Sequence, residues 1–426
     1  MLADTKETAV GVLPRDWDIV PLGDVLIQSQ YGLSIRGQRT GSVPILRMNC
    51  QQDGRVVFRD LQYVDVDAKT LAQYRLRDGD LLFNRTNSFE LVGRTATFAG
   101  NREAVFASYL VRLRVDDKRL DPRFLTFFMN LPTTRERLKG LATRGVSQSN
   151  ISASKLRTLE IVVPPLEDQH RIVFVLASFQ QGRIVGDQRI EALRQLRAAT
   201  MAKLFREGLR GEPLKQTEIG QIPIDWEIKR LGDPAFATTG AGGTPDRSDP
   251  ACFGGPIRWA KSGELGDDLV EKTEETITEK GLRTSSAKVL PTGTLLVAMY
   301  GATAGATGIL AIPAATNQAI CSVIPVGDSF SPEFLQHFLI HSRSRLLAAR
   351  HGGAQPNLSQ QILRGILVAV PNIEEQRGIA RALVSLASAI RIAERRARRL
   401  SELFDTLLGD LMSGKLRLRA RVAHHA

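Results

Sequence analysis

The sequence predicts a mixed α/β fold of class α+β, with two tandem α/β globular units, each followed by a long helix. The two helices are expected to pair as an antiparallel coiled coil. Two observations predict this architecture: an internal repeat, and two apolar stripes at helical spacing. The length of 426 residues exceeds one ordinary domain, and 43% hydrophobic residues suffice for more than one core.

The repeat is clearest at two proline-bounded helix starts. "PPLEDQHRI" begins at Pro164, and "PNIEEQRGI" begins 207 positions later at Pro371. Upstream, "LPRDWDIVPLGD" at Leu13 matches "IPIDWEIKRLGD" at Ile222, with an offset of 209. The offset is constant through the helices and drifts in the globular parts, which indicates variable globules joined to helices of fixed length. The predicted boundaries are 13–165 and 222–371 for the globular units, and 166–212 and 372–417 for the helices.

Each helix has a start signal and an apolar stripe. Glu167 and Glu374 follow the prolines and place negative charge in the first turn, where the helix dipole favours it. Gly182 and Gly186 predict a break or kink in the first helix. Either stripe alone also fits an ordinary core helix, but the matched lengths favour a pair. The residues predicted to pack between the helices are Ile190, Leu193, Leu196 and Leu204 in the first, and Leu400, Leu403, Leu407 and Leu411 in the second.

The globular units contain short β-like runs separated by glycine turns, which predicts a partly antiparallel sheet in each. The uncharged stretch from Val289 to Gly327 is long enough to suggest a membrane span. However, it is rich in glycine, alanine and threonine and is bracketed by Pro291 and Pro313, which favours paired buried strands and no membrane contact. The N-terminal sequence lacks a signal peptide pattern, and the three scattered cysteines fit a reducing compartment, so we expect a cytoplasmic protein.

The charge of the chain suggests a polyanionic partner and is unevenly distributed. The formal net charge is +12. Residues 13–165 hold 23 Lys+Arg and 16 Asp+Glu, whereas residues 222–371 hold 13 and 14. The second globular unit must therefore bind any polyanion through local geometry rather than through bulk charge.

Motifs for catalysis are missing from the sequence. There is no Asn-Pro-Pro-Tyr/Phe or Asp-Pro-Pro-Tyr string for adenine methylation and no G-x-x-x-x-G-K-[ST] phosphate loop. "GATAGATG" at Gly301 lacks a dinucleotide fingerprint and favours a strand-turn-strand. His337 and His341 have metal-ligand spacing, but Phe338 stands where a zinc protease needs glutamate, so we interpret them as helix-surface residues. We expect no catalytic residue, no metal site and no cofactor in this chain.

The order and the duplication of several strings resemble the DNA-specificity (S) subunit of type I restriction–modification systems. The resemblance covers residues 13–417. In the first half the strings are "VPLGD" from Val20, "VPILRMNCQQDG" from Val43, "GDLLFNRTNSFELVG" from Gly79, "SQSNIS" from Ser147 and "PPLEDQHRI". In the second half they are "TEIGQIPIDWE" from Thr217, "GGTPDR" from Gly242, "IRWAKSGEL" from Ile257, "MYGATAG" from Met299, "ATNQAI" from Ala315 and "PNIEEQRGI".

The resemblance implies that each globular unit is a target-recognition domain that reads one half of a split double-stranded DNA sequence. It also implies that the helices set the gap and dock two modification subunits, which carry S-adenosylmethionine and methylate adenine N6. Restriction/translocase subunits would complete the complex. Two alternatives remain: a self-contained DNA methyltransferase or nuclease, against which the missing motifs argue, and a DNA-binding regulator or remnant without enzyme partners.

The candidate DNA-binding residues of the first unit are chosen because guanidinium and amide groups match base edges. "NRTNS" follows the apolar run "LLF" and is the strongest candidate; a polar hairpin turn is its structural alternative. For the other segments the alternatives are a solvated loop and ion pairing. Asn150 is expected to cap the next helix rather than to read a base. The candidates are Arg36, Gln38, Arg39, Arg47, Asn49, Asn84, Arg85, Thr86, Asn87, Ser88, Ser147 and Gln148.

The second unit offers fewer arginines and more small polar groups. Tyr300 is expected to stack on a base or contact phosphate, with a buried strand aromatic as the alternative. The candidates are Thr244, Arg247, Lys261, Ser262, Tyr300, Thr303, Asn317, Gln318 and Gln355.

Overall fold

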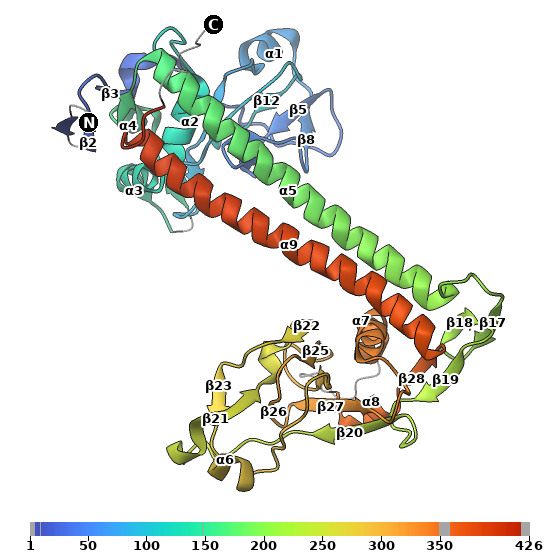
Figure 1. Ribbon diagram of the computed structural model, residues 1–426. Helices are drawn as coiled ribbons and strands as arrows, with labels where there is room; N and C mark the ends of the chain where they lie inside the picture. Colours follow the sequence, from blue (N-terminus) through green and yellow to red (C-terminus); the bar gives the residue numbers. More distant parts are fainter. Residues whose placement is uncertain (1–4, 9, 147, 349–357, 419–426) are drawn as a thin grey trace, which may run out of the picture. The chain divides into compact units, whose positions relative to one another are not determined.

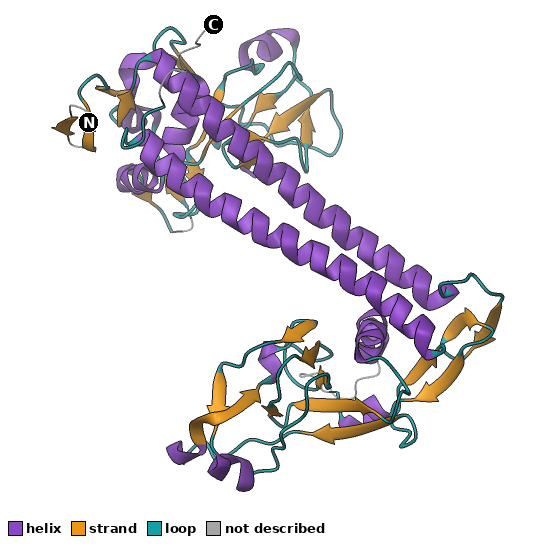
Figure 2. Ribbon diagram, viewed as in Figure 1, coloured by secondary structure: helices purple, strands orange, loops and turns teal. Residues whose placement is uncertain are grey.

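The computed structural model describes residues 5–8, 10–146, 148–348 and 358–418 (Figure 1). The chain forms two compact units. The first consists of Met1–Gly186 with Arg396–Ala426, and the second consists of Asp187–Arg395. Two long helices, α5 (Leu166–Glu207) and α9 (Ile373–Met412), contribute to both units. Figure 2 shows that the strands gather in the globular parts and that the two long helices are free of them.

The globular part of the first unit is built on a six-stranded sheet. Its order is β4 (Leu26–Tyr31), β13 (Leu110–Val115), β9 (Leu81–Asn84), β11 (Thr95–Thr97), β7 (Arg55–Val56) and β6 (Gln51–Gln52). A second sheet has the order β12 (Val105–Phe106), β5 (Val43–Leu46) and β8 (Gln62–Val64). All pairs are antiparallel except β7 with β11 and β5 with β12.

Smaller elements complete the first unit. The strand pairs are β1 (Thr5–Thr8) with β2 (Gly11–Pro14) and β3 (Asp18–Pro21) with β16 (Glu160–Val163). A three-stranded sheet has the order β10 (Thr86–Asn87), β15 (Ser149–Asn150) and β14 (Thr143–Arg144). The short α-helices are α1 (Ala68–Tyr74), α2 (Pro122–Asn130), α3 (Pro132–Leu141) and α4 (Ala153–Arg157), and the 3-10 helices are η1 (Leu22–Val25) and η2 (Met48–Cys50).

The second unit repeats this topology. Its larger sheet has the order β20 (Ala237–Ala241), β27 (Ile320–Pro325), β24 (Leu295–Ala298), β25 (Thr307–Leu310) and β22 (Asp268–Val270). Its smaller sheet has the order β23 (Glu275–Ile277), β21 (Phe253–Ala260) and β26 (Ala315–Thr316). The remaining strand pairs are β17 (Leu214–Thr217) with β18 (Gly220–Pro223) and β19 (Glu227–Arg230) with β28 (Leu367–Val370). The α-helices are α6 (Glu279–Arg283), α7 (Pro332–Ala348) and α8 (Gln360–Arg364), and the 3-10 helices are η3 (Pro250–Cys252) and η4 (Ser262–Glu264).

The duplication extends to single hydrogen bonds. At the end of β9, Asn84 N donates to Arg94 O at 2.8 Å; at the end of β24, Ala298 N donates to Ala306 O at 2.8 Å. In both units a short strand pairs in parallel with its neighbour in the larger sheet, as β7 does with β11 and β22 does with β25. The sequence repeat is therefore a repeat of one fold, and the predicted class of two tandem α/β units is confirmed.

The uncharged stretch from Val289 to Gly327 contains strands and no long helix. It holds β24, β25, β26 and β27, and β24 pairs antiparallel with both β25 and β27. This confirms the prediction of paired buried strands. Among the helices of the described residues, none combines the length and the apolar character that a membrane crossing requires.

The glutamine of each repeated helix start fixes the long helix to its globular part. Gln169 accepts a hydrogen bond from Asp121 N (2.8 Å) and donates to Pro164 O (2.7 Å). Gln376 accepts from Ser331 N (3.0 Å) and donates to Pro371 O (2.9 Å) in the second unit. Both glutamines are buried. A buried amide that lost these partners would leave backbone groups unsatisfied, which explains why the motif recurs.

A tryptophan lies in the core that joins globule and helices in each unit. Trp17 belongs to a cluster that includes residues of both α5 and α9, and Trp226 belongs to the corresponding cluster of the second unit. The residues contributed by the long helices are Ile172, Val173, Leu176, Phe404, Leu408, Leu411 and Met412 in the first unit, and Met201, Phe205, Ile379, Ala380 and Leu383 in the second. The helices are thus part of the hydrophobic cores, not appendages to them.

Helix α5 is continuous from Leu166 to Glu207, so a break at Gly182 and Gly186, one of the two predicted forms, is excluded. An added Cβ at Gly182 would lie 3.3 Å from Leu400 Cδ2, and one at Gly186 would lie 3.9 Å from Ala397 Cβ. The glycines therefore allow close approach of α9 while the helical hydrogen bonds persist. Since the partner numbers fall as the α5 numbers rise, the helices run antiparallel, as predicted.

The predicted apolar stripe needs correction at two positions. Leu196 is 52% exposed and Leu403 is 48% exposed, so neither lies in the packed face. A pattern of 3.6 residues per turn drifts from any fixed spacing, and the buried face uses neighbouring residues instead. Ile190 and Leu411 are buried, and Leu193, Leu204, Leu400 and Leu407 are half-buried; their packing between the helices stays a prediction. The buried helix residues that the prediction omitted include Met201, Phe205 and Leu408.

Candidate nucleic-acid interface

The three-stranded sheet of the first unit brings two predicted DNA-binding segments together. In the register of β10 with β15, Thr86 pairs with Asn150 and Asn87 pairs with Ser149. On the other side of β15, Thr143 pairs with Asn150 and Arg144 pairs with Ser149. The "NRTNS" and "SQSN" segments are about 60 residues apart in the sequence but adjacent in the structure, which the sequence did not predict.

Arg85 is the most organised cation of this sheet. Its Nη2 donates to Asn150 Oδ1 at 3.1 Å, and its guanidinium lies 4.6 Å from the centre of the Tyr31 ring. Asn150 Nδ2 in turn donates to Thr86 Oγ1 at 3.2 Å. Stacking on an exposed aromatic ring orients a guanidinium without neutralising it, so Arg85 keeps its charge for an external acceptor.

Asn150 does not cap the next helix, so that prediction is wrong. The N-cap of α4 is Ser152, whose hydroxyl accepts from Lys155 N at 3.2 Å. Asn150 lies two residues earlier in β15, and its amide belongs to the Arg85 contact. Its counterpart in the repeat, Asn357, lies outside the described residues.

A second arginine on an aromatic ring borders the same sheet. Arg144 lies 3.9 Å from the ring centre of Phe89, and Lys139 Nζ lies 5.5 Å from it. Lys139 Nζ also donates to Glu90 and Glu136, each at 2.9 Å, and these hydrogen bonds raise the pKa of Lys139. Arg144 has no such carboxylate among the described residues. Neither Arg144 nor Tyr31 was predicted from the sequence; aromatic residues near a basic segment were the available signal.

Asn84 lies inside the protein, contrary to the prediction. The side chain is 1% exposed, and neither amide atom has a hydrogen-bond partner among the residues described. Asn84 is the last residue of β9, a strand that is covered on both faces and whose four residues are all buried. The next residues are more accessible: Thr86 and Asn87 are half-buried and Ser88 is exposed. Asn87 Oδ1 accepts from Ser88 N at 2.8 Å, as in a polar turn.

The other candidates of the first unit fall into two groups. Arg36, Gln38 and Arg39 lie in the segment between β4 and β5, and all three are exposed. Arg47 Nη2 donates to Asp60 O at 3.1 Å and Asn49 Nδ2 to the same oxygen at 3.5 Å, which agrees with a structural role in holding a loop. Their part in DNA binding stays a prediction. Gln148 is exposed, and Ser147 lies outside the described residues.

The two cations among the candidates of the second unit, Arg247 and Lys261, are paired with glutamates of the same unit. Arg247 Nη1 lies 2.6 Å from Glu275, and the guanidinium lies 4.8 Å from Phe253 and 5.0 Å from Trp259. Lys261 Nζ lies 2.8 Å from Glu274 and 2.9 Å from Glu275. The hydrogen bonds that Lys261 donates to these two glutamates raise the pKa of Lys261. The hydrogen bonds that Glu275 accepts from Arg247 and then from Lys261 lower the pKa of Glu275.

The remaining candidates of the second unit form short polar contacts. Thr244 Oγ1 donates to Gln318 Oε1, and Thr303 Oγ1 donates to Ser262 O at 3.1 Å. Tyr300 is 40% exposed, so the alternative of a buried strand aromatic is wrong. Asn317 Oδ1 is buried with no partner in the part of the chain that the structure describes. Gln355 lies outside the described residues.

His337 is not a helix-surface residue, which corrects that part of the prediction. It is 2% exposed in α7, and neither ring nitrogen has a hydrogen-bond partner among the described residues. Burial, followed by the nearby charge of Arg197, lowers its pKa to about 4. Within the described ranges, no group of three histidine, cysteine or acidic residues could hold a metal ion.

Comparison with known proteins identifies a family. The model of the type I restriction modification DNA specificity domain matches this chain twice, at residues 14–195 and 223–402. One similar protein is provisionally named the type I restriction enzyme MjaX specificity subunit of Methanocaldococcus jannaschii; it is 26% identical over 97% of this chain and 97% of its own. The type I restriction enzyme MjaVIII specificity subunit of the same organism is 24% identical over 96% of this chain and 94% of its own length.

Solved structures share the fold. The crystal structure of a type I restriction–modification S subunit from M. genitalium superposes with a TM-score of 0.63 at 16% identity, covering 96% of this chain and 99% of that one. A chain from a study of complex assembly and conformational transition of the type I R-M system has a TM-score of 0.55 at 18% identity. The match covers 95% of this chain and 99% of that one. These identities support the architecture alone.

Proposed function

The chain belongs to the family of type I restriction–modification DNA specificity domains, and we propose that it is the subunit that reads a split double-stranded DNA target for such a complex. The observation that carries the proposal is the duplication of one strand framework with different polar side chains at its loops. Each unit then reads one half of the target. The chain supplies recognition, and the chemistry belongs to other subunits.

In the first unit the proposed reading surface is the sheet of β10, β15 and β14. Arg85 and Arg144 present guanidinium groups that are held by aromatic rings. An arginine that keeps two free N–H groups is the usual partner of guanine O6 and N7 in the major groove. The half-site read by this unit is therefore expected to contain guanine, with Asn87 and Ser88 adding amide and hydroxyl contacts.

The proposed docking surface for two modification subunits is the exposed apolar part of the long helices. Phe174, Val185 and Leu403 are exposed in the first unit, and Leu196 and Ile392 are exposed in the second. Apolar side chains exposed along a helix pair favour a protein partner. The modification subunits would carry S-adenosylmethionine, and restriction/translocase subunits would join the same complex. The constant helix length would set the gap between the half-sites.

The proposal assigns the complex to the cytoplasm. Cys50, Cys252 and Cys321 are all buried and free, and burial raises the pKa of the Cys321 thiol to about 12. Unpaired, unreactive thiols suit a reducing compartment.

The proposal is tested by exchanging residues 13–165 for the first globular unit of another family member. The hybrid is expressed with its modification and restriction subunits, and methylated sites are mapped by methylation-sensitive sequencing. We expect one half of the target to change and the other half and the gap to persist. A change in both halves would contradict modular reading. A stand-alone regulator or remnant would instead purify without any methyltransferase and leave genomic methylation unchanged.

A further inference from the structure

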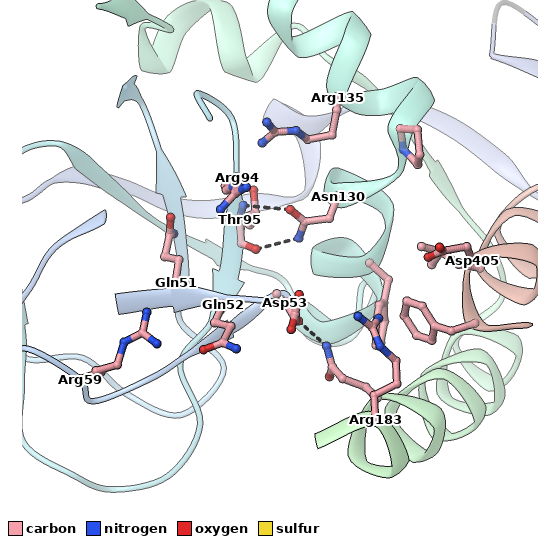
Figure 3. Close-up of a pocket in the computed structure, with 16 residues that line it drawn as sticks. Gln51, Gln52, Asp53, Arg59, Arg94, Thr95, Asn130, Arg135, Arg183 and Asp405 are labelled. Carbon is pink, nitrogen blue, oxygen red and sulfur yellow. Dashed lines mark hydrogen bonds between the residues drawn. The ribbon is translucent and has the colours of Figure 1, made fainter. Parts of the chain in front are cut away.

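A cleft of about 550 Å³ in the first unit is lined by arginines that none of the DNA-binding predictions used (Figure 3). Its walls come from the β6–β7 hairpin, β11, α2, α3 and the first-unit segments of α5 and α9. Apolar side chains of α2 and α9 form part of the lining. The four arginines of the cleft are Arg59, Arg94, Arg135 and Arg183.

Two of these arginines, Arg94 and Arg135, lie close together and form no ion pair with the residues described. The side chain of Arg94 is exposed and makes no hydrogen bond to them. Arg135 Nη2 donates to Glu90 O at 2.6 Å, but its Nη1 is buried and has no partner in the described ranges. The pKa of Arg135 is lowered by burial and then by the charge of Arg94. Asp53 and Asp405 also line the cleft, yet neither pairs with these two arginines.

In the second unit, two carboxylates beside the corresponding turn are paired with arginines of α7 and α9. Asp53 precedes β7 with φ 49°, and Asp267 precedes β22 with φ 63°. Asp267 accepts from Arg343 of α7, and the next residue, Asp268, accepts from Arg391 of α9. In the described part of the first unit, the corresponding hairpin supplies no such carboxylate to Arg94 or Arg135.

The cleft adjoins the loop that carries the proposed reading residues. Arg94 ends this loop, and its carbonyl accepts from Asn84 N at the start of it. Arg135 holds the carbonyl of Glu90 in the middle of the loop. Side chains that read a major groove about 12 Å wide are flanked on both sides by rows of phosphates. A duplex read by Arg85 would therefore bring a phosphate row to the side of the loop where Arg94 and Arg135 lie.

From this arrangement we propose that Arg94 and Arg135 form an anchoring site for a backbone phosphate of the DNA bound by the first unit. The inference rests on the proposed function, since it requires DNA on the neighbouring loop. The guanidinium groups bind a phosphodiester through charge-assisted hydrogen bonds and contact no base. The site contributes affinity and orientation, and it leaves the target sequence unchanged.

The test uses the full chain in complex with its methyltransferase subunits. Binding to a fluorescent duplex with the mapped target, and to a scrambled duplex, is measured by anisotropy from about 50 to 200 mM salt. One lost phosphate contact reduces the slope of log affinity against log salt by about one. We expect Arg94→Ala to reduce this slope by about one and to weaken binding to both duplexes about threefold to tenfold. The methylated sequence should stay unchanged. Alanine is compatible with the fold here, because Ala306 occupies the corresponding position in the second unit.

Two further variants control the experiment. Arg94→Lys keeps the charge and should restore most of the salt slope. Arg137→Ala removes an arginine of the same helix as Arg135, but one that pairs with Glu160 at 3.9 Å, and should leave the slope unchanged. Inorganic phosphate is added as a competitor and should weaken the wild type more than Arg94→Ala.

Each contrary outcome has its own meaning. If the wild type prefers its target but Arg94→Ala keeps the wild-type slope, the anchoring site is refuted and the proposed function stands. If Arg94→Ala lowers the amount of co-purified methyltransferase instead, the cleft docks protein and the phosphate site is refuted. If the wild-type complex does not distinguish the mapped target from the scrambled duplex, the proposed function itself fails.

Discussion

The two units share one framework but handle charge in opposite ways. In the first, Arg85 and Arg144 lie on the rings of Tyr31 and Phe89 and keep their charge available. In the second, Arg247 also lies on aromatic rings, but Glu275 holds it and Lys261 together. An aromatic platform orients a cation, whereas a carboxylate also neutralises it. The difference shows that one fold can present a basic surface or a nearly neutral one without changing its strands.

The strand framework that the two units share can be tested at two glycines, each of which follows the first strand of the larger sheet in its unit. An added Cβ would lie 2.3 Å from Ala107 O at Gly32, and 2.3 Å from Thr316 O and Asn317 O at Gly242. Backbone atoms cannot move aside, so Gly32→Val and Gly242→Val should each destabilise their unit by about 3 kcal/mol or more. Calorimetry of the full chain should show a lowered melting transition in each variant.

Gly140→Ala is the matched control, because an added Cβ in α3 meets no atom within 4 Å. It should be neutral or stabilise by up to about 1 kcal/mol. If only one of the two valine variants were destabilised, the two units would not rest on the same backbone constraint.

The buried helix position that differs between the units predicts a difference in acid stability. His337 in α7 corresponds to Phe127 in α2, and burial lowers the pKa of the histidine from 6.5 to about 4. Between these values the unfolded chain binds a proton that the folded chain excludes, so stability is lost as pH falls from 6.5 to about 4. Near pH 4.5 this amounts to about 2–3 kcal/mol in the second unit.

The variant His337→Phe should remove this loss and leave stability at neutral pH unchanged or raised, since no hydrogen bond of the ring is broken. The reciprocal variant Phe127→His should make the first unit acid-sensitive. Thermal unfolding at about pH 7 and pH 4.5 measures both. Equal acid sensitivity of His337→Phe and the wild type would show that other groups dominate this range.

The charge contrast on the reading surfaces predicts a smaller effect. Glu274→Gln with Glu275→Gln should release Arg247 and Lys261 and raise DNA affinity of the complex about threefold to tenfold, with a salt slope steeper by about one to two. Glu271→Gln removes a carboxylate from an exposed residue and serves as the control. Anisotropy at several salt concentrations measures the change. An unchanged slope would mean that these two cations do not face DNA.

The repeated motifs suffice to predict much of the architecture. The proline-bounded helix starts predict α5 and α9, because proline and acidic residues favour a first helical turn locally. The tertiary contacts explain why the glutamine recurs: Gln169 and Gln376 bind backbone groups of Asp121 and Ser331, more than 40 residues earlier in the chain. The sequence shows that the motif recurs, but it does not show which backbone groups the glutamine contacts.

The candidate site was predictable only in part. Residue types identified "NRTNS" as a polar segment after a buried strand, yet the buried strand extends one residue further and includes Asn84, while the residues after it are more accessible. Likewise, spacing identified Arg247 and Lys261 as cations but could not show that Glu274 and Glu275 neutralise them. Ion pairing depends on distances between strands, which sequence spacing does not report.

The duplication, the antiparallel helix pair, the buried strands of the uncharged stretch and the charge difference between the units were all readable from the amino-acid sequence. These features follow from local propensity, periodicity and composition, which each segment carries alone. Packing in three dimensions was needed to show which cations are free, that β15 joins two distant polar segments, and that Arg94 and Arg135 have no ion pair within the described residues. Those properties depend on contacts between residues far apart in the chain, because burial and electrostatic partnership are set by the folded neighbours.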